Sequence, residues 1–187
     1  MSEVARAFLS VDIGDNALIS RVAHIQQKLD RQSAKMKIVE PDNLHFTLRF
    51  FGDTPLTKID QIRHELERLE FSPFTIRIEG VGAFPSRRRP NVIWVGVTHN
   101  VERFVRLKLS IDDLLGNLGF PSDRRFHAHV TIARVRSVKD RNRIQDSLDS
   151  LATESVGTMT VDCFRLTRST LTQAGPIYET MWEVRGR

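Results

Sequence analysis

A short pattern that combines histidine with threonine occurs twice in the sequence. His45-Phe46-Thr47-Leu48 and His129-Val130-Thr131-Ile132 share the order His, apolar, Thr, apolar, and the second copy follows the first by nearly half the chain. With this composition, two such matches among six histidines arise by chance in roughly a few sequences per thousand. The pattern therefore indicates an internal repeat, with one motif in each half of the chain.

The first copy separates polar from apolar side chains when it is extended. Alternate residues of a β-strand point to opposite sides, so His45 and Thr47 are predicted to share one face. The same alternation assigns Phe46, Leu48 and Phe50 to the other face. A sheet built on this strand would bury its apolar side under helices and present the histidine and the threonine on the open side.

The second copy has the same alternation. His127, His129 and Thr131 are predicted on one face, with Val130 and Ile132 on the opposite one. If the two halves of the chain face each other about a pseudo-twofold axis, the two His-Thr pairs converge on one cleft.

Two histidines with two threonines suit phosphoryl chemistry. Imidazoles with an ordinary pKa near 6.5 can divide the work at neutral pH, one neutral as the general base and one charged as the general acid. A threonine hydroxyl donates a hydrogen bond to a phosphoryl oxygen, where charge must be stabilised. His127 and His129 could also be two metal ligands, but no third ligand stands at a recognisable spacing, so we expect neither a metal nor another cofactor.

The charge balance favours an anionic partner. The chain of 187 residues has a formal net charge of +5 and a pI near 9.9. Arginines gather at 87–89 and between Arg134 and Arg143, either as nucleic-acid contacts or as solvated loops. No apolar run suggests a membrane span, and a single cysteine, Cys163, suits a reducing compartment. We expect a cytoplasmic monomer that does not associate with a membrane.

Hydrophobic periodicity predicts an α+β fold in which strands and helices alternate. Thr57 is the predicted N-cap of the second helix, with Asp60 in the capping-box position. No linker divides the halves, so residues 1–187 are expected to form one domain of two packed lobes. Strands are predicted over 6–13, 44–51, 74–79, 92–97, 127–134, 159–166 and 177–184, helices over 18–29, 57–69, 104–118 and 144–151, and an open loop over 84–91.

The doubled motif, written HFTL and HVTI, resembles the 2H phosphoesterase superfamily. Within it, the sequence is similar to the RNA 2′,3′-cyclic phosphodiesterase family of bacteria and archaea, also called 2′-5′ RNA ligases. The similarity covers nearly the whole chain, through the segments RAFLSVDI, NLHFTLRFFGD, FPSRRRPNVIWVGV, FHAHVTIAR and STLTQAGPIYE.

This resemblance implies a bilobal fold with two pseudo-symmetric antiparallel sheets, outer helices and a central cleft. One lobe is expected from both chain ends and the other from the middle of the chain. The implied reaction is metal-free hydrolysis of RNA 2′,3′-cyclic phosphate ends to 2′-phosphomonoesters, with 2′-5′ ligation as a reverse reaction.

The resemblance also implies roles for single residues. His45 is expected to be the proton donor and His129 the proton acceptor, with Thr47, Thr131 and Arg134 holding the phosphate. Strand alternation places Arg134 off the cleft face unless the strand bends or ends there.

The implied partner is RNA that ends in a 2′,3′-cyclic phosphate, tRNA fragments included. Two other functions stay open: a phosphodiesterase for small cyclic nucleotides, and a binding module that recognises RNA ends without catalysis. The side chains that we expect to contact RNA, some of them alternatively core residues, are Phe8, Arg87, Arg88, Arg89, His127 and Tyr178.

Overall fold

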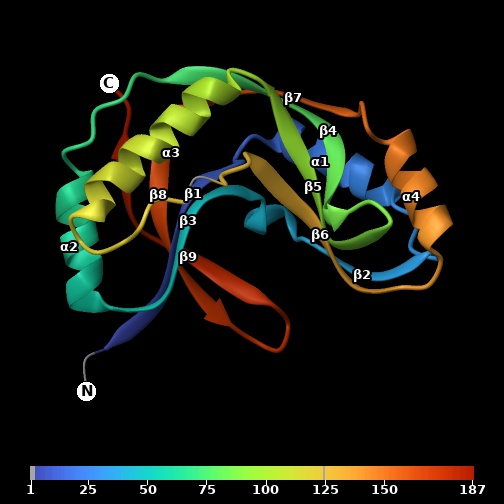
Figure 1. The fold of residues 1–187 in the computed structure, drawn as a ribbon, viewed down its shortest axis with the longest axis horizontal. Helices are drawn as coiled ribbons and strands as arrows, with labels where there is room; N and C mark the ends of the chain where they lie inside the picture. The colour runs from blue at the N-terminus through green and yellow to red at the C-terminus, as the bar shows by residue number, and fades with distance from the viewer. Residues whose placement is uncertain (1–2, 124) are drawn as a thin grey trace.

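Antiparallel strands alternate with helices along the chain of the computed structural model, which describes residues 3–123 and 125–187 (Figure 1). The elements are β1 (Val4–Asp12), α1 (Asn16–Lys28), β2 (Ala34–Ile38), a 3₁₀ turn (Pro41–Asn43), β3 (His45–Pro55), α2 (Leu56–Leu66), β4 (Phe74–Ser86), β5 (Arg89–His99), α3 (Val101–Gly116), β6 (His129–Val138), α4 (Arg141–Ser150), β7 (Ser155–Val161), β8 (Cys163–Leu171) and β9 (Pro176–Arg185). The α+β class predicted from the sequence is confirmed.

The strands follow the order β7-β4-β5-β6-β3-β1-β8-β9, and β2 pairs with β6. Outward from the centre, β3, β1, β8 and β9 form one half, and β6, β5, β4 and β7 form the other. The halves are continuous, since β3 and β6 pair at Phe46 and Val130. The two motif strands are therefore central neighbours, as a pseudo-symmetric fold requires.

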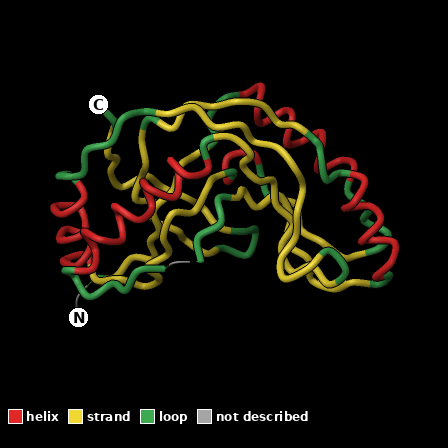
Figure 2. The backbone as a smooth tube through the Cα atoms, turned by 45° about the horizontal axis from the view of Figure 1, so that its top comes forward, coloured by secondary structure: helices red, strands yellow, loops and turns green. Residues whose placement is uncertain are grey.

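The helices lie on the outer side of the two halves (Figures 1 and 2). Helices α2 and α3 pack together beside β3, whereas α1 packs on β7 and β6, and α4 on β4. The half that contains β1, β8 and β9 takes its strands mostly from the chain ends, as expected. It also includes β3, α2 and α3 from the middle of the chain, while α1 crosses to the other half.

The apolar positions of the two motifs anchor the centre of the sheet. Phe46, Leu48, Val130 and Ile132 are all buried, and the ring of Phe46 lies 5.1 Å from that of Phe104 on α3. Burying one such side chain contributes about 1.5–3 kcal/mol relative to leaving it in water. The side of the sheet opposite the cleft is therefore a packed core, which holds both histidine-bearing strands in place.

Helices α1 and α2 begin in different ways. The Asp15 carboxylate caps α1, because it accepts hydrogen bonds from the backbone N–H groups of Ala17 at 2.7 Å and Leu18 at 3.2 Å. The prediction that Thr57 caps α2 is wrong. Strand β3 continues to Pro55 and passes directly into the helix, so no capping loop and no side-chain cap bond form there.

Three strand boundaries also differ from the sequence analysis. The predicted open loop over 84–91 is mostly strand, because β4 runs to Ser86 and β5 begins at Arg89. The predicted strand over 159–166 breaks at Asp162 into β7 and β8. Strand β2 was not predicted, although Ala34, Met36 and Ile38 alternate with lysines in its five residues.

A buried ion cluster fixes the segment that leads to the second motif. Asp112 on α3 accepts hydrogen bonds from Lys108 and, at 2.7 Å, from Arg49 on β3. It also accepts the backbone N–H of Asp123 at 3.0 Å, and Arg49 donates to the carbonyl of Pro121 at 2.7 Å. Burial raises the pKa of Asp112, but the hydrogen bonds from Lys108 and Arg49 outweigh it, so the pKa is lowered and the carboxylate stays charged.

Candidate functional site

The first motif presents its polar side chains on the same face of the sheet as alternate residues of β1. On β3, His45 pairs with Asp12 and Thr47 pairs with Ser10 across an antiparallel ladder. Opposed residues of such a ladder point to the same side. The histidine therefore lies beside a carboxylate from a strand that is far from it in the sequence.

The second motif repeats this arrangement on β6. His129 pairs with Gly96 and Thr131 pairs with Trp94 on β5. Gly96 and Trp94 alternate on their strand, so His129 and Thr131 share one face. In contrast to His45, His129 has a glycine and not a carboxylate opposite it.

A β-bulge follows the threonine in both strands. Leu48 on β3 and Ile132 on β6 are each an extra residue with no opposite partner. Each bulge reverses the alternation of the residues after it. Arg134 therefore lies on the same face as His129 and Thr131. The irregularity at Ile132 is the bend without which alternation would have placed Arg134 on the opposite face. The prediction that Phe50 points away from His45 is wrong for the same reason.

Both imidazoles are oriented by a backbone carbonyl two residues earlier in the chain. The Nδ1 of His45 lies 2.8 Å from the carbonyl oxygen of Asn43, and the Nδ1 of His129 lies 2.7 Å from that of His127. A carbonyl only accepts, so Nδ1 carries the proton in each ring and donates it. The Nε2 atoms are left to exchange protons, and that of His45 lies 3.0 Å from Oγ1 of Thr47.

Burial lowers the pKa of both histidines, and the charges around them differ. For His45, burial is the largest cause; the Asn43 carbonyl and the Asp12 carboxylate raise its pKa, and Arg134 and His129 lower it. For His129, burial is again the largest cause; the His127 carbonyl raises its pKa, and electrostatic interaction with His127 and Arg134 lowers it. A carboxylate thus raises the pKa of His45, whereas the charge interactions given for His129 lower its pKa.

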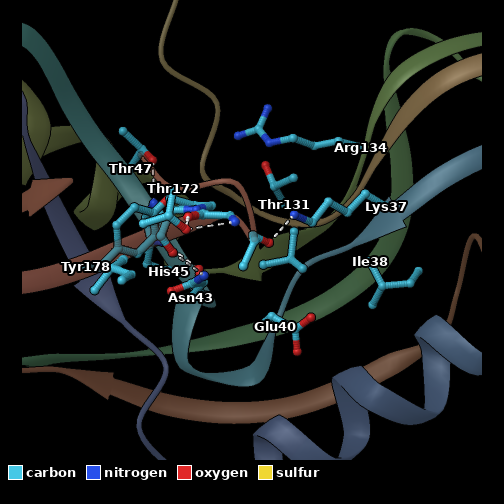
Figure 3. Close-up of a pocket in the computed structure, with 15 residues that line it drawn as sticks. Lys37, Ile38, Glu40, Asn43, His45, Thr47, Thr131, Arg134, Thr172 and Tyr178 are labelled. Atoms are coloured by element: carbon cyan, nitrogen blue, oxygen red, sulfur yellow. Dashed lines mark hydrogen bonds between the residues drawn. The ribbon is translucent and has the colours of Figure 1, made fainter. Parts of the chain in front are cut away.

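A cavity of about 320 Å³ opens beside the first motif. Figure 3 shows Thr131 and Arg134 on one side of it and His45, Thr47 and Tyr178 on the other. His129 is on the same face of β6 as Thr131 but does not line this cavity. The remaining residues that line it are Lys37, Ile38, Val39, Glu40, Asn43, Thr172, Ala174, Gly175, Pro176 and Ile177.

The turn between β8 and β9 closes one end of the cavity by contacts across the two halves. The Lys37 ammonium on β2 donates to the carbonyl of Ala174 at 2.8 Å (Figure 3). The Asn43 side chain donates to the carbonyl of Pro176 at 3.3 Å. Neither Lys37 nor Asn43 nor the carboxylate of Asp12 was picked out from the sequence, since each reaches the site through pairing of distant segments.

The aromatic rings of Phe8 and Tyr178 pack against the imidazole of His45. Phe8 is 4% exposed, and its ring lies 4.8 Å from that of His45 and 5.0 Å from that of Tyr178. The rings of His45 and Tyr178 are 5.4 Å apart. Phe8 is therefore packed beneath the histidine, and the half-buried Tyr178 offers more surface to a ligand than Phe8 does.

A second aromatic group surrounds His129. The ring of Phe84 lies 5.1 Å from that of His129, and the ring of Trp94 lies 4.7 Å from that of His127. Trp94 covers Gly82, where a Cβ atom would lie 2.2 Å from the indole. His127 is exposed beside this group, at the start of the second motif.

The predicted arginine contacts divide into bound and exposed side chains. Arg87 donates to Asp149 at 2.5 Å and to the carbonyl of Val81 at 3.1 Å, so it anchors the β4–β5 turn to α4. Arg88 and Arg89 are exposed at that turn.

Other reactive groups lie outside the site. Cys163 is half-buried, and burial raises its pKa, which disfavours a thiolate. Within residues 3–123 and 125–187, no group of three or more His, Cys, Asp or Glu side chains is placed to hold a metal ion. None of the helices in these ranges is long and apolar enough to span a membrane.

Comparison with known proteins identifies the family. The model of the family described as LigT like Phosphoesterase matches twice, over residues 13–94 and 95–178, so each match contains one His-x-Thr motif. The chain belongs to the LigT-like phosphoesterase family. The two matches also agree with the repeat that the motifs indicate.

Named relatives cover nearly the full length of this LigT-like chain. The RNA 2′,3′-cyclic phosphodiesterase of Methanothermobacter thermautotrophicus is 41% identical, over 94% of this chain and 96% of its own. That of Archaeoglobus fulgidus is 40% identical, over 94% and 97%. The crystal structure of E. coli LigT in its apo form shares the fold, with a TM-score of 0.79 and 22% identity over 99% of both chains.

Proposed function

We propose that this protein hydrolyses 2′,3′-cyclic phosphate ends of RNA to 2′-phosphomonoesters, with His45 and His129 as its acid and base. The observation that carries the proposal is the matched pair of imidazoles, each held at Nδ1 by a carbonyl two residues earlier. This orientation leaves both Nε2 atoms available for proton transfer. The activity in the names of the full-length relatives supports the same reaction.

In the proposed step, a water oxygen attacks phosphorus in line with the 3′ oxygen. Neutral His129 accepts the water proton at Nε2. The bond from phosphorus to the 3′ oxygen breaks, and charged His45 gives its Nε2 proton to that oxygen. The products are a 2′-phosphomonoester and a 3′ hydroxyl, and solvent returns both histidines to their starting states.

Thr47, Thr131 and Arg134 are the proposed phosphate ligands. Hydroxyl and guanidinium groups donate hydrogen bonds to phosphoryl oxygens, and all three side chains line the cavity beside His45. Stabilising the charge that develops on these oxygens lowers the barrier without a metal. Activity should therefore persist in excess EDTA.

The unequal fields around the histidines support the direction of proton transfer. Asp12 raises the pKa of His45, which must be charged as the acid, whereas Arg134 lowers the pKa of His129, which must be neutral as the base. Burial lowers the pKa of His45. The negative charge of a bound phosphate acts in the opposite direction and restores the acid form.

The deciding experiment is product analysis with an oligoribonucleotide that ends in a 2′,3′-cyclic phosphate. We expect a 2′-phosphomonoester, with no metal added. A 3′-phosphate product would contradict the assigned leaving group, and tight binding without turnover would favour an RNA-end binding module.

A second candidate substrate is a small cyclic nucleotide, because the cavity of about 320 Å³ suits a single nucleoside. Competition between a mononucleoside cyclic phosphate and the oligonucleotide would rank the two. A preference for the oligonucleotide would support RNA ends, tRNA fragments among them, as the substrates.

A further inference from the structure

The same position in the two motif strands carries two different side chains. Arg134 and Phe50 are each the fifth residue after the motif histidine, and each follows the extra residue that reverses the strand alternation. Both therefore point to the face that carries the His-Thr pairs. One half presents a guanidinium at this place, and the other presents an aromatic ring that is 53% exposed.

Phe50 is connected to His45 through Phe8, which lies between them. Phe50 pairs with Phe8, whose ring contacts those of His45 and Tyr178. The guanidinium carbon of Arg6 lies 4.7 Å from the centroid of the Phe50 ring. Arg6 is two residues before Phe8 on β1, so it shares the same face. An exposed aromatic ring with a guanidinium over it thus adjoins the candidate active site.

We propose that Phe50 and Arg6 bind the base of the nucleotide that precedes the terminal one in an RNA substrate. This inference rests on the proposed function, since it places the rest of an RNA chain whose end lies between the histidines. Phe50 is the fifth residue after His45 along the strand, a distance of about 15 Å. That distance exceeds the length of one nucleoside, so the base that reaches Phe50 belongs to the neighbouring nucleotide.

The chemistry of the two side chains matches this occupant. Every nucleobase has a π-face that stacks on an aromatic ring, and a guanidinium stacks on a base or pairs with a phosphodiester. The chain has a net charge of +5, which favours a polyanion over an apolar peptide on this surface. Single exposed apolar side chains are common on proteins, and Leu109 on α3, 39% exposed, is an aliphatic example.

Two substrates separate this subsite from the catalytic centre. One is a mononucleoside 2′,3′-cyclic phosphate, and the other is a dinucleotide that ends in the same group. Phe50→Ala should raise KM for the dinucleotide by about 5-fold to 150-fold, the loss expected for one base stack, and leave KM for the mononucleotide unchanged. Phe50→Tyr should retain the wild-type KM for both substrates, and Leu109→Ala should change KM for neither.

Three further variants sharpen the result. Phe50→Leu keeps apolar volume without a ring and should behave like Phe50→Ala, which guards against a folding defect in the smaller variant. Arg6→Gln should weaken binding of the dinucleotide but not of the mononucleotide. It should also reduce the slope of log affinity against log salt concentration by about 0.7, whereas Arg6→Lys should retain the wild-type slope.

Equal effects of Phe50→Ala on both substrates, or no effect on either, would overturn the subsite. Failure of the wild-type protein to open either cyclic phosphate would instead overturn the proposed function. A readout without turnover separates these outcomes. RNA with a 2′-phosphate end and 2-aminopurine at the penultimate position should lose fluorescence on binding wild-type protein but not Phe50→Ala, and equal quenching by both proteins would contradict the stack.

Discussion

The two motif strands have nearly the same backbone and different surroundings. Strands β3 and β6 each present a histidine held at Nδ1, a threonine two residues later and a bulge after the threonine. Across from His45 lies Asp12, whereas Gly96 lies across from His129. A repeated backbone therefore places two equivalent imidazoles, and the neighbouring strands make them electrostatically unequal. The second property is the one that supports the proposed division into acid and base.

The largest expected effect comes from removing either histidine. His45→Ala and His129→Ala should each reduce kcat by about 10²–10⁴, because each removes one proton transfer. The double variant should lose little more than a single one, since the two groups act as a unit. The exposed His99 at the end of β5 provides the control, and His99→Ala should retain activity. A folded single variant with near wild-type kcat would remove that histidine from the mechanism.

The next effect concerns Arg134, two residues after the extra residue of β6. Arg134→Ala should lower kcat/KM by about 10-fold to 150-fold for mononucleotide and dinucleotide alike, because a charge-assisted hydrogen bond to phosphate is lost. Arg134→Lys should recover part of this loss, since it retains the charge without the guanidinium fork. Arg136→Ala, which removes a neighbouring exposed arginine, is the matched control. Loss on the dinucleotide alone would place Arg134 outside the phosphate site.

The smallest effect tests the electrostatic difference itself. His45 must be charged to donate a proton, so the rate falls as pH rises through its pKa in the complex. Asp12→Asn removes a charge that raises this pKa, and the alkaline limb of the rate profile should move to lower pH.

Arg165 forms ion pairs with two carboxylates, that of Asp12 at 2.9 Å and that of Glu183 at 3.2 Å. Glu183→Gln is therefore the matched control, because it breaks an ion pair of Arg165 without touching the partner of His45. A uniform fall in kcat for Asp12→Asn, with the alkaline limb in place, would mean that the carboxylate does not tune the histidine.

The sequence predicted the features that depend on alternation between adjacent residues. The faces of His45, Thr47, His129 and Thr131 follow from adjacent residues, and the structure has each motif pair on one face. The repeat itself is visible in the sequence because both motifs use the same residue types. The apolar residues between them were also correctly expected in the core, since burial follows the same alternation.

What the sequence did not predict depends on pairing between distant segments. The bulges at Leu48 and Ile132 exist only relative to β1 and β5, so simple alternation assigned Phe50 to the wrong face. Asp12 lies opposite His45 through strand register, which no local pattern reveals. Lys37 reaches the cavity because β2 pairs with β6.

The division of labour between the histidines is tested most directly by changing the leaving group. In a cyclic substrate with sulfur in place of the bridging 3′ oxygen, the departing thiolate needs no proton, so the acid is dispensable while water activation is still required. We predict that this substrate restores most of the lost rate to His45→Ala and little to His129→Ala, measured as single-turnover rates against the oxygen substrate. Preferential recovery of His129→Ala would reverse the assigned roles, and equal recovery of both variants would contradict a division of labour.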